Sequence, residues 1–342
     1  MDYRYMKNRY TKTKFIALAI VIMVCVLVFF GNITTLSIYI KYREGQNFQN
    51  KYMFNKAILK YNSIIKTRPS YLNAYLARGR CFLNLNEWQM ANDDFQKVIF
   101  FDHNNISARS GLAYCYCCEG NMNKGLIEFD NIIKFSPNSA LAYFDRGIYF
   151  RHARKQKLAI DDFTKALQLN HEYSYVYICR GAAYDDIGRF DLALADYNEA
   201  IKFKPNDVMA YENRAIAYYK IGMYDLAIDD DDKVLSIKSD EYEAYINRSK
   251  CYQKNQMVDL ALADINKAID LNPKNETAYE NRSILDIMKG NPNLAIMDLN
   301  KAIELKPNDA IAYFNLSLIY KCLGQTDLAT KDLALAHKYG YH

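Results

Sequence analysis

Three cysteines that lie close together are the first candidates for chemistry: Cys115, Cys117 and Cys118. His152 follows Cys118 by 34 residues, and Asp186 follows after 34 more. A catalytic Cys–His–Asp set needs side chains within hydrogen-bond reach, whereas neighbouring helices pack about 8–10 Å apart. Zinc needs four converging ligands, and successive residues of a helix point in different directions. We therefore expect no catalytic residues and no metal site here, and we interpret these thiols as small buried side chains.

Composition and charge narrow the class of protein. The chain has 342 residues, 51% of them apolar, and only 6 prolines, so it can form a core and is too apolar to be disordered. Residues 1–43 hold seven basic residues and one acidic residue, which leaves 37 basic and 38 acidic residues in the other 299. Because this larger part carries no net positive charge, we expect no nucleic-acid partner.

The N-terminal segment has the composition of a membrane anchor. No charged residue lies between Lys14 and Lys41, and residues 15–30 are wholly apolar. About 20 such residues cross a bilayer, whereas the apolar core of a cleaved signal peptide has about 7–15. We therefore expect a basic tail over residues 1–14 and an uncleaved, single-pass transmembrane helix over residues 15–40. A cleaved signal peptide and a buried helix are the alternatives.

The side of the membrane that carries the remaining chain stays open. Basic residues flank the apolar segment on both sides, so the positive-inside bias only weakly favours a cytoplasmic N-terminus. Seven cysteines after the segment form no evident disulfide framework, which favours a reducing compartment for this part instead. The two indications point to opposite orientations.

A 34-residue repeat organises the rest of the chain. Tyrosines recur at this spacing or its double: Tyr75, Tyr143, Tyr177, Tyr211, Tyr245, Tyr279 and Tyr313. Prolines form a second column: Pro69, Pro137, Pro205, Pro273 and Pro307. Units that begin at residues 72, 106, 140, 174, 208, 242, 276 and 310 cover the chain to residue 342 without an insertion.

Each unit predicts two helices. Counted from the first residue of a unit, rings and small residues occupy positions 4, 8 and 11, and then positions 20, 24 and 27. These steps of three and four place each set on one helix face, and proline at position 32 ends the second helix. Asp231 breaks the pattern, because it occupies the aromatic position 24 and so predicts a weakened or rearranged unit. The acidic run around it, residues 229–232, lacks the glycine of a calcium loop.

These features resemble the tetratricopeptide repeat, whose signature is a ring, a small residue and a ring, then alanine, an aromatic residue and proline at these offsets. The match covers residues 72–342, and a partial repeat or linker helix over residues 41–71 precedes it, with Ala57, Tyr61, Ile64 and Pro69 at positions 20, 24, 27 and 32. The resemblance implies an all-α, right-handed superhelical solenoid of about eight helix-turn-helix units after the transmembrane helix. Since no segment remains for a catalytic domain, we expect neither enzymatic activity nor a cofactor.

Paired charges recur within the units. Position 7 is arginine in six of them: Arg78, Arg146, Arg180, Arg214, Arg248 and Arg282. Position 23 is acidic in all eight units. Since arginine between two helices is costly unless it is paired, we predict an ion pair between positions 7 and 23 in each of the six. A phosphate-binding row of arginines is the alternative, and the matched acids argue against it.

A second row of polar side chains suggests a binding surface. Position 6 faces the concave groove in tetratricopeptide proteins, and four consecutive units carry asparagine there: Asn213, Asn247, Asn281 and Asn315. An amide both donates to and accepts from a peptide backbone. The row resembles the asparagine ladders of the O-linked N-acetylglucosamine transferase and of importin-like solenoids, which grip extended peptides. Apolar neighbours complete the predicted peptide-binding site: Ile216, Ile246, Ile284, Phe314 and Leu318.

We therefore expect a membrane-anchored scaffold or adaptor whose groove binds an extended segment of a partner protein. A receptor for acidic chaperone tails is disfavoured, because no unit has the basic residue at position 5 that such a carboxylate clamp needs. A targeting or import receptor and a secretion or assembly factor are alternatives that differ in the side of the membrane. A structural homo-oligomer is another, because the last helix carries Leu328, Leu333 and Leu335 with no polar capping helix after it.

Overall fold

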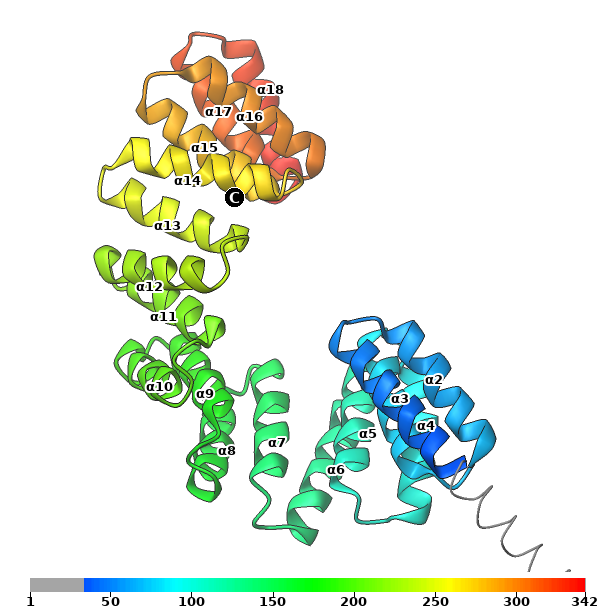
Figure 1. Cartoon of the computed structure of the whole chain (residues 1–342). Helices are drawn as coiled ribbons and strands as arrows, with labels where there is room; N and C mark the ends of the chain where they lie inside the picture. Colours follow the sequence, from blue (N-terminus) through cyan, green and yellow to red (C-terminus); the bar gives the residue numbers. More distant parts are fainter. Residues whose placement is uncertain (1–33, 342) are drawn as a thin grey trace, which may run out of the picture. The chain divides into compact units, whose positions relative to one another are not determined.

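The computed structural model describes residues 34–341, and within that range the regular structure is helical, without strands. Residues 34–50 are helical and precede α2 (Phe54–Thr67). The following helices are α3 (Leu72–Asn84), α4 (Trp88–Phe101), α5 (Ile106–Cys118), α6 (Met122–Phe135), α7 (Ala140–His152), α8 (Gln156–Leu169), α9 (Ser174–Asp186), α10 (Phe190–Phe203), α11 (Val208–Lys220), α12 (Tyr224–Ile237), α13 (Tyr242–Lys254), α14 (Val258–Leu271), α15 (Glu276–Met288), α16 (Pro292–Leu305), α17 (Ala310–Cys322) and α18 (Thr326–Lys338) (Figure 1).

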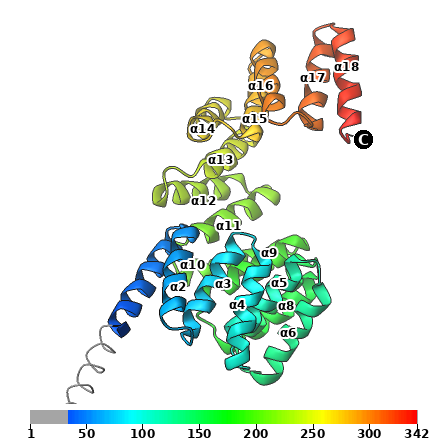
Figure 2. The ribbon, with the colours of Figure 1, turned by 90° about the vertical axis from the view of Figure 1, so that its right-hand side faces the viewer.

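The odd-numbered helices from α3 to α17 begin at the residues that start the eight sequence units. Each is followed by the even-numbered helix of the same hairpin. The described chain divides within α7 into two compact units, one ending at Tyr149 and the other beginning at Phe150. Within the second unit, helices α11 to α18 follow one another as successive hairpins in both views (Figures 1 and 2).

Small residues allow the two helices of a hairpin to approach closely. Ala193 of α10 is fully buried, and Tyr197 one turn later is 1% exposed. A β-carbon added to Gly181 of α9 would lie 2.7 Å from the Tyr197 ring, which is closer than any real contact allows. The ring at position 24 therefore occupies the space that the small residue at position 8 leaves open.

The turn within each hairpin depends on a left-handed residue at position 15. Gly222 ends α11 with φ +80°, a conformation that glycine adopts without strain. Asn86, Arg154 and Gln256 occupy the same position with φ between 57° and 61°. The fold thus imposes one backbone geometry on this turn, even where the sequence lacks glycine.

The predicted membrane segment falls largely outside the described residues. The basic tail, residues 1–14, and the predicted span up to residue 33 lie in the part that the structure does not describe. Within residues 34–341, every helix is too short or too polar to cross a bilayer. The last residues of the predicted span belong to the helix over residues 34–50, where Ile38 is 5% exposed and shares a core cluster with Tyr61 and Cys81. This end of the predicted span therefore packs against the first helical hairpin.

Candidate peptide-binding groove

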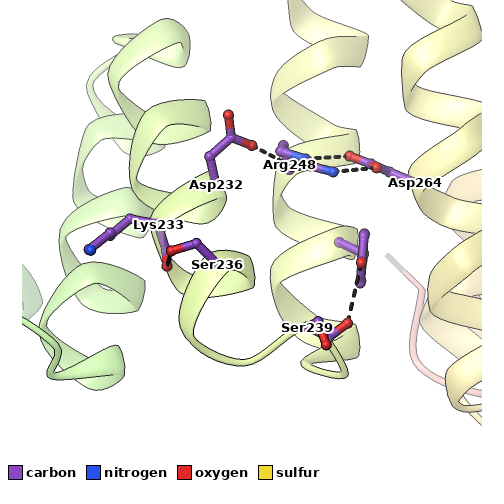
Figure 3. Close-up of polar contacts among 7 residues, drawn as sticks. Asp232, Lys233, Ser236, Ser239, Arg248 and Asp264 are labelled. Atoms are coloured by element: carbon purple, nitrogen blue, oxygen red, sulfur yellow. Dashed lines mark hydrogen bonds and ion pairs between the residues drawn. The ribbon is translucent and has the colours of Figure 1, made fainter.

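The arginine at position 7 is the centre of a repeated polar network. Arg248 of α13 donates through Nε and Nη2 to both carboxylate oxygens of Asp264 in α14, at 2.7 Å each. Its Nη1 donates to Asp232 of α12, in the preceding unit. Figure 3 shows the guanidinium between these two acids. One side chain thus joins three helices.

The predicted pairs between positions 7 and 23 are confirmed in five units: Arg78–Asp94, Arg180–Asp196, Arg214–Asp230, Arg248–Asp264 and Arg282–Asp298. Arg146 forms an ion pair with Asp130, at 2.7 Å. Asp130 occupies position 25 of the preceding unit, as do the other backward partners: Asn62, Thr164, Asn198, Asp232 and Asn266. Sequence reasoning missed this contact between units, although a polar column at position 25 signalled it.

Aromatic rings enclose the same guanidinium groups. The Arg214 guanidinium carbon lies 5.5 Å from the ring centre of Tyr211 and 5.8 Å from that of Tyr218. These rings occupy positions 4 and 11, so the helical repeat itself sets the arrangement. With acids and rings around it, each arginine is committed to the fold. The arrangement supports a structural role for this row.

The three neighbouring cysteines lie in different surroundings, so their interpretation as buried side chains was wrong for Cys118. Cys115 is fully buried, whereas Cys118 of the same helix is exposed. Burial raises the pKa of the Cys115 thiol to about 12 and that of Cys117 to about 11, so both remain protonated at neutral pH. Asp186 instead accepts a hydrogen bond from Arg151 at 3.2 Å. Among residues 34–341, no group of three or more metal-ligating side chains could hold an ion.

The four predicted asparagines lie on successive first helices, in different surroundings. Asn213 of α11 donates through Nδ2 to the Met209 carbonyl at 2.7 Å, within its own helix. Asn247 of α13 lines a cavity. Asn281 of α15 has its Nδ2 enclosed, without a hydrogen-bond partner in the described chain. Asn315 of α17 is half-buried. The row exists in the fold, but its amides are not equivalent.

The predicted apolar neighbours separate into exposed and covered residues. Ile216, Ile284 and Leu318 share position 9 and are 38%, 41% and 45% exposed. Ile246 is 5% exposed and belongs to the core cluster with Ile265 and Tyr279, so its assignment to the open surface was wrong. The Phe314 ring stacks on Tyr341 with the ring centres 3.9 Å apart. Both Ile246 and Phe314 occupy position 5, which in these two units faces neighbouring side chains.

One cavity opens beside this row, between α11, α12 and α13. Its volume is about 300 Å³, and its lining includes Ile216, Tyr219, Asn247 and Asp231. Asp231 stands where other units carry a large apolar or aromatic side chain, and it is fully buried. The sequence marked Asp231 as an exception but gave no indication of a cavity. A second cavity of about 400 Å³ lies between α17 and α18 and includes Phe314, Leu318 and Leu333.

Comparison with known proteins agrees with this architecture. Family profiles described as TPR repeat or tetratricopeptide repeat match residues 186–222, 242–275 and 299–331. Human tetratricopeptide repeat protein 6 is 26% identical over 120 residues, which cover 34% of this chain and 23% of that protein. Human protein O-mannosyl-transferase TMTC3 is 26% identical over 110 residues, which cover 32% of this chain and 12% of that protein. The chain thus spans less than a quarter of either relative.

A solved structure resembles a larger share of the fold. The crystal structure of the APC/C hetero-tetramer Cut9–Hcn1 matches 82% of this chain and 52% of the compared chain, with a TM-score of 0.58 and 17% sequence identity. At this identity the likeness concerns the fold alone. Helical hairpins of 34 residues, the three matching profiles and this likeness lead to one conclusion: over residues 34–341 the chain is all-helical and built from tetratricopeptide repeats.

Proposed function

We propose that this chain is a membrane-anchored scaffold that binds an extended segment of a partner protein along the first helices of its repeats. One observation carries the proposal: the amide of Asn247 and the apolar side chain of Ile216 line the same cavity, although they lie on different helices. A peptide that crosses these helices would meet an amide at position 6 and apolar surface at position 9. For this purpose we define the groove row as Asn213, Asn247, Asn281 and Asn315 with Ile216, Ile284 and Leu318.

The chemistry of the groove row suits an extended peptide. Each amide can donate to a peptide carbonyl and accept from a peptide N–H, so the backbone is held whatever its sequence. The Nδ2 of Asn281 is an unpaired donor but is enclosed, so a peptide carbonyl would reach it only after a covering side chain moves. The exposed side chains at position 9 supply apolar contact beside these bonds. Proteins built from tetratricopeptide repeats mediate protein–protein interaction, and the compared solved structure is itself a protein complex.

Peptide selection followed by substitution tests this proposal. Peptides of 15 random residues would be selected on the full-length chain in detergent micelles, and their Kd measured by fluorescence anisotropy. Alanine at all four asparagines of the groove row should weaken binding at least tenfold, since each backbone hydrogen bond contributes about 0.5–1.5 kcal/mol. The control variant replaces exposed residues of second helices: Lys202→Ala, Lys267→Ala and Asn300→Ala. Equal affinity of the two variants, with unchanged helicity, would contradict the proposal.

The membrane anchor is the second part of the proposal, and it rests on the sequence. Residues 15–30 are apolar without a break and basic residues flank the segment. The full-length chain should therefore stay with membranes after alkaline extraction. The variant Ile20→Asp with Val24→Asp should be released, because two charges at the bilayer centre oppose insertion by about 5–7 kcal/mol together. Release of the unaltered chain would exclude an integral anchor.

The orientation separates the two alternative roles. If the repeats face the cytosol, protease added to sealed vesicles would digest them, as expected for a targeting or import receptor. If the repeats lie on the far side, they would be protected, as expected for a secretion or assembly factor. Either result is compatible with peptide binding, so the experiment assigns the compartment only.

Self-association through the C-terminal helix is a third alternative, favoured by one observation. Leu328 and Leu333 of α18 are 42% and 37% exposed. Sedimentation of the full-length chain in detergent micelles would detect an oligomer, and the double variant Leu328→Glu with Leu333→Glu should dissociate it. A monomer at all concentrations would remove this alternative. Our proposal remains a binding role, because the likeness to the mannosyl-transferase covers only 12% of that protein and gives no support for a transfer activity.

A further inference from the structure

The core of the second compact unit contains an acid where other hairpins have apolar bulk. In seven other hairpins position 24 carries a large, fully buried side chain: Tyr61, Phe95, Phe129, Phe163, Tyr197, Ile265 and Leu299. In α12 it is Asp231, which is 0% exposed. Neither carboxyl oxygen of Asp231 has a hydrogen-bond partner within residues 34–341. An unpaired buried carboxyl group is costly, so this position calls for a partner that the described chain does not supply.

The space that a ring would have filled is open. The cavity of about 300 Å³ has Asp231 in its lining, with walls from two first helices: Ala215, Ile216, Tyr219 and Lys220 from α11, and Asn247, Lys250 and Cys251 from α13. Asp231 itself is fully enclosed, so an incoming group must displace a lining side chain to reach it. Ile216, which is 38% exposed, and the flexible Lys250 can move without disturbing the core.

The acids around Asp231 are already paired with arginines. Asp230 and Asp232 flank Asp231 in α12, and Asp264 approaches from α14. Arg248 of α13, which acts on Asp231 electrostatically, is already held by Asp264 and Asp232. Asp230 is held by Arg214 of α11, so each of these three acids already has an arginine partner, whereas Asp231 has none among the described residues.

The remaining cations near the cavity lie in its lining. Lys220 of α11 is paired with Asp185 at 2.6 Å. Lys250 of α13 carries its charge on a long side chain. Neither ammonium group is described as a partner of Asp231, so no lysine of the lining pairs with its carboxyl group.

We propose that this cavity receives an arginine side chain of the peptide bound along the groove row. The inference rests on the proposed function and adds a specificity to it. A guanidinium group presents two parallel N–H donors, which match the two unpaired oxygens of Asp231. The chain uses the same geometry internally, as in the bidentate pair of Arg214 with Asp230. Tyr219 lies in the cavity wall, and an aromatic ring can attract a guanidinium group.

Proton release would accompany this binding. Burial raises the pKa of Asp231 to about 8, so the carboxyl group is largely protonated at neutral pH while the cavity is empty. A guanidinium group favours the ionised form. Below about pH 8 each unit of pH should therefore strengthen binding by up to tenfold, and above it the affinity should level off. Besides the acids and lysines already named, Arg248, Tyr219 and Cys251 face Asp231, and burial raises the pKa of the Cys251 thiol to about 12.

Two small probes test the cavity directly. Titration calorimetry would compare n-butylguanidinium with n-butylurea, its neutral counterpart of the same shape, on the full-length chain in detergent micelles. At pH 8 the cation should bind at least tenfold more tightly, with a Kd in the millimolar range. Asp231→Asn should abolish that preference, and Asp231→Phe should abolish binding of both probes by filling the cavity. Asp229→Asn, an exposed change in the same helix, is the matched control and should leave the preference intact.

A second arm separates this inference from the peptide groove. Nine-residue peptides of alternating serine and alanine would carry one central arginine or citrulline. If the unaltered chain binds the arginine peptide more tightly than the citrulline peptide, and Asp231→Asn removes this difference, both proposals are supported. If neither peptide binds but n-butylguanidinium does so through Asp231, the cavity is confirmed and the groove is contradicted. The inference is overturned, whatever the peptides do, if n-butylguanidinium at up to about 50 mM binds no more tightly than n-butylurea, or if its advantage persists in Asp231→Asn.

Discussion

Arg248 and Asp264 form a bidentate ion pair across the α13–α14 hairpin, with both N–O distances at 2.7 Å. The remaining nitrogen of the guanidinium group donates to Asp232 of the preceding hairpin. Only 17% of the Arg248 side chain and 10% of the Asp264 side chain are exposed. This pair therefore contributes both to its own hairpin and to the contact between consecutive units.

Removing the acid of this pair should loosen the hairpin locally. Asp264→Ala leaves a mostly buried guanidinium group with one partner instead of two, which costs about 2–3 kcal/mol. Amide hydrogen exchange along α13 and α14 should accelerate about 30- to 150-fold, because opening becomes easier by that amount. Lys289→Ala is the control, since its pair with Asp259 is 42% and 87% exposed and contributes little. An effect of Asp264→Ala no larger than that of the control would refute the structural role.

The buried acid of α12 should make stability depend on pH. The folded-state pKa of Asp231 is about 8, above its ordinary value of 3.8. Between these values the unfolded chain is ionised while the folded chain holds the proton, so stability falls as pH rises from about 4 to 8. Asp231→Asn removes this contribution. The unfolding free energy of the variant, relative to that of the unaltered chain, should therefore rise by at least about 1 kcal/mol between pH 5 and pH 8.

Measuring this difference in both proteins isolates Asp231. Burial also raises the pKa of Glu212 and Glu280 to about 7, and these groups contribute a dependence of the same sign to both proteins. Parallel curves of stability against pH for the two chains, from denaturant unfolding followed by fluorescence, would show that Asp231 titrates normally in the folded state.

The left-handed turn at position 15 offers a stabilising change. Gln256 holds φ +60°, a conformation that side chains with a β-carbon disfavour. Gln256→Gly should raise the unfolding free energy of the α13–α14 hairpin by about 0.5–1 kcal/mol. The reciprocal change, Gly222→Gln at the same position of the preceding hairpin, should lower it by a similar amount. If both substitutions act in the same direction, backbone conformation does not determine stability at this turn.

Close approach between helices predicts the opposite outcome for another glycine. Gly181→Ala would improve helix propensity by about 1 kcal/mol, yet the added carbon would meet the Tyr197 ring at 2.7 Å. We expect a net loss of about 1–2 kcal/mol in thermal or denaturant unfolding. Tyr197→Leu in the same chain should make Gly181→Ala less harmful, because a smaller side chain leaves room. Equal costs in both backgrounds would contradict this packing argument.

Much of the fold follows from short-range rules that a sequence displays. Helix boundaries depend on the 34-residue register and on proline, and Pro205 and Pro273 indeed lie just after α10 and α14. The ion pairs were predictable because positions 7 and 23 face each other within one hairpin. The third arginine contact was not, because it depends on how one hairpin stacks on the next.

The binding surface was less predictable than the fold. Ile246 was assigned to the groove from its position number, but it packs against the neighbouring hairpin and is buried. Asp231 appeared in the sequence only as an exception. When a ring is absent, the helices either leave a cavity or move together. The outcome depends on the packing of three helices, which a local sequence pattern does not show.

Photo-crosslinking tests the central claim most directly, namely that the groove row holds the peptide. A photoreactive benzoylphenylalanine would replace Ile216, Ile284 or Leu318 on first helices, and Leu226, Leu260 or Leu294 on second helices, all of which are exposed. With a labelled peptide selected on the unaltered chain, the account predicts crosslinks at the first-helix sites and their loss with excess unlabelled peptide. Crosslinks confined to the second-helix sites would place the peptide elsewhere and contradict it.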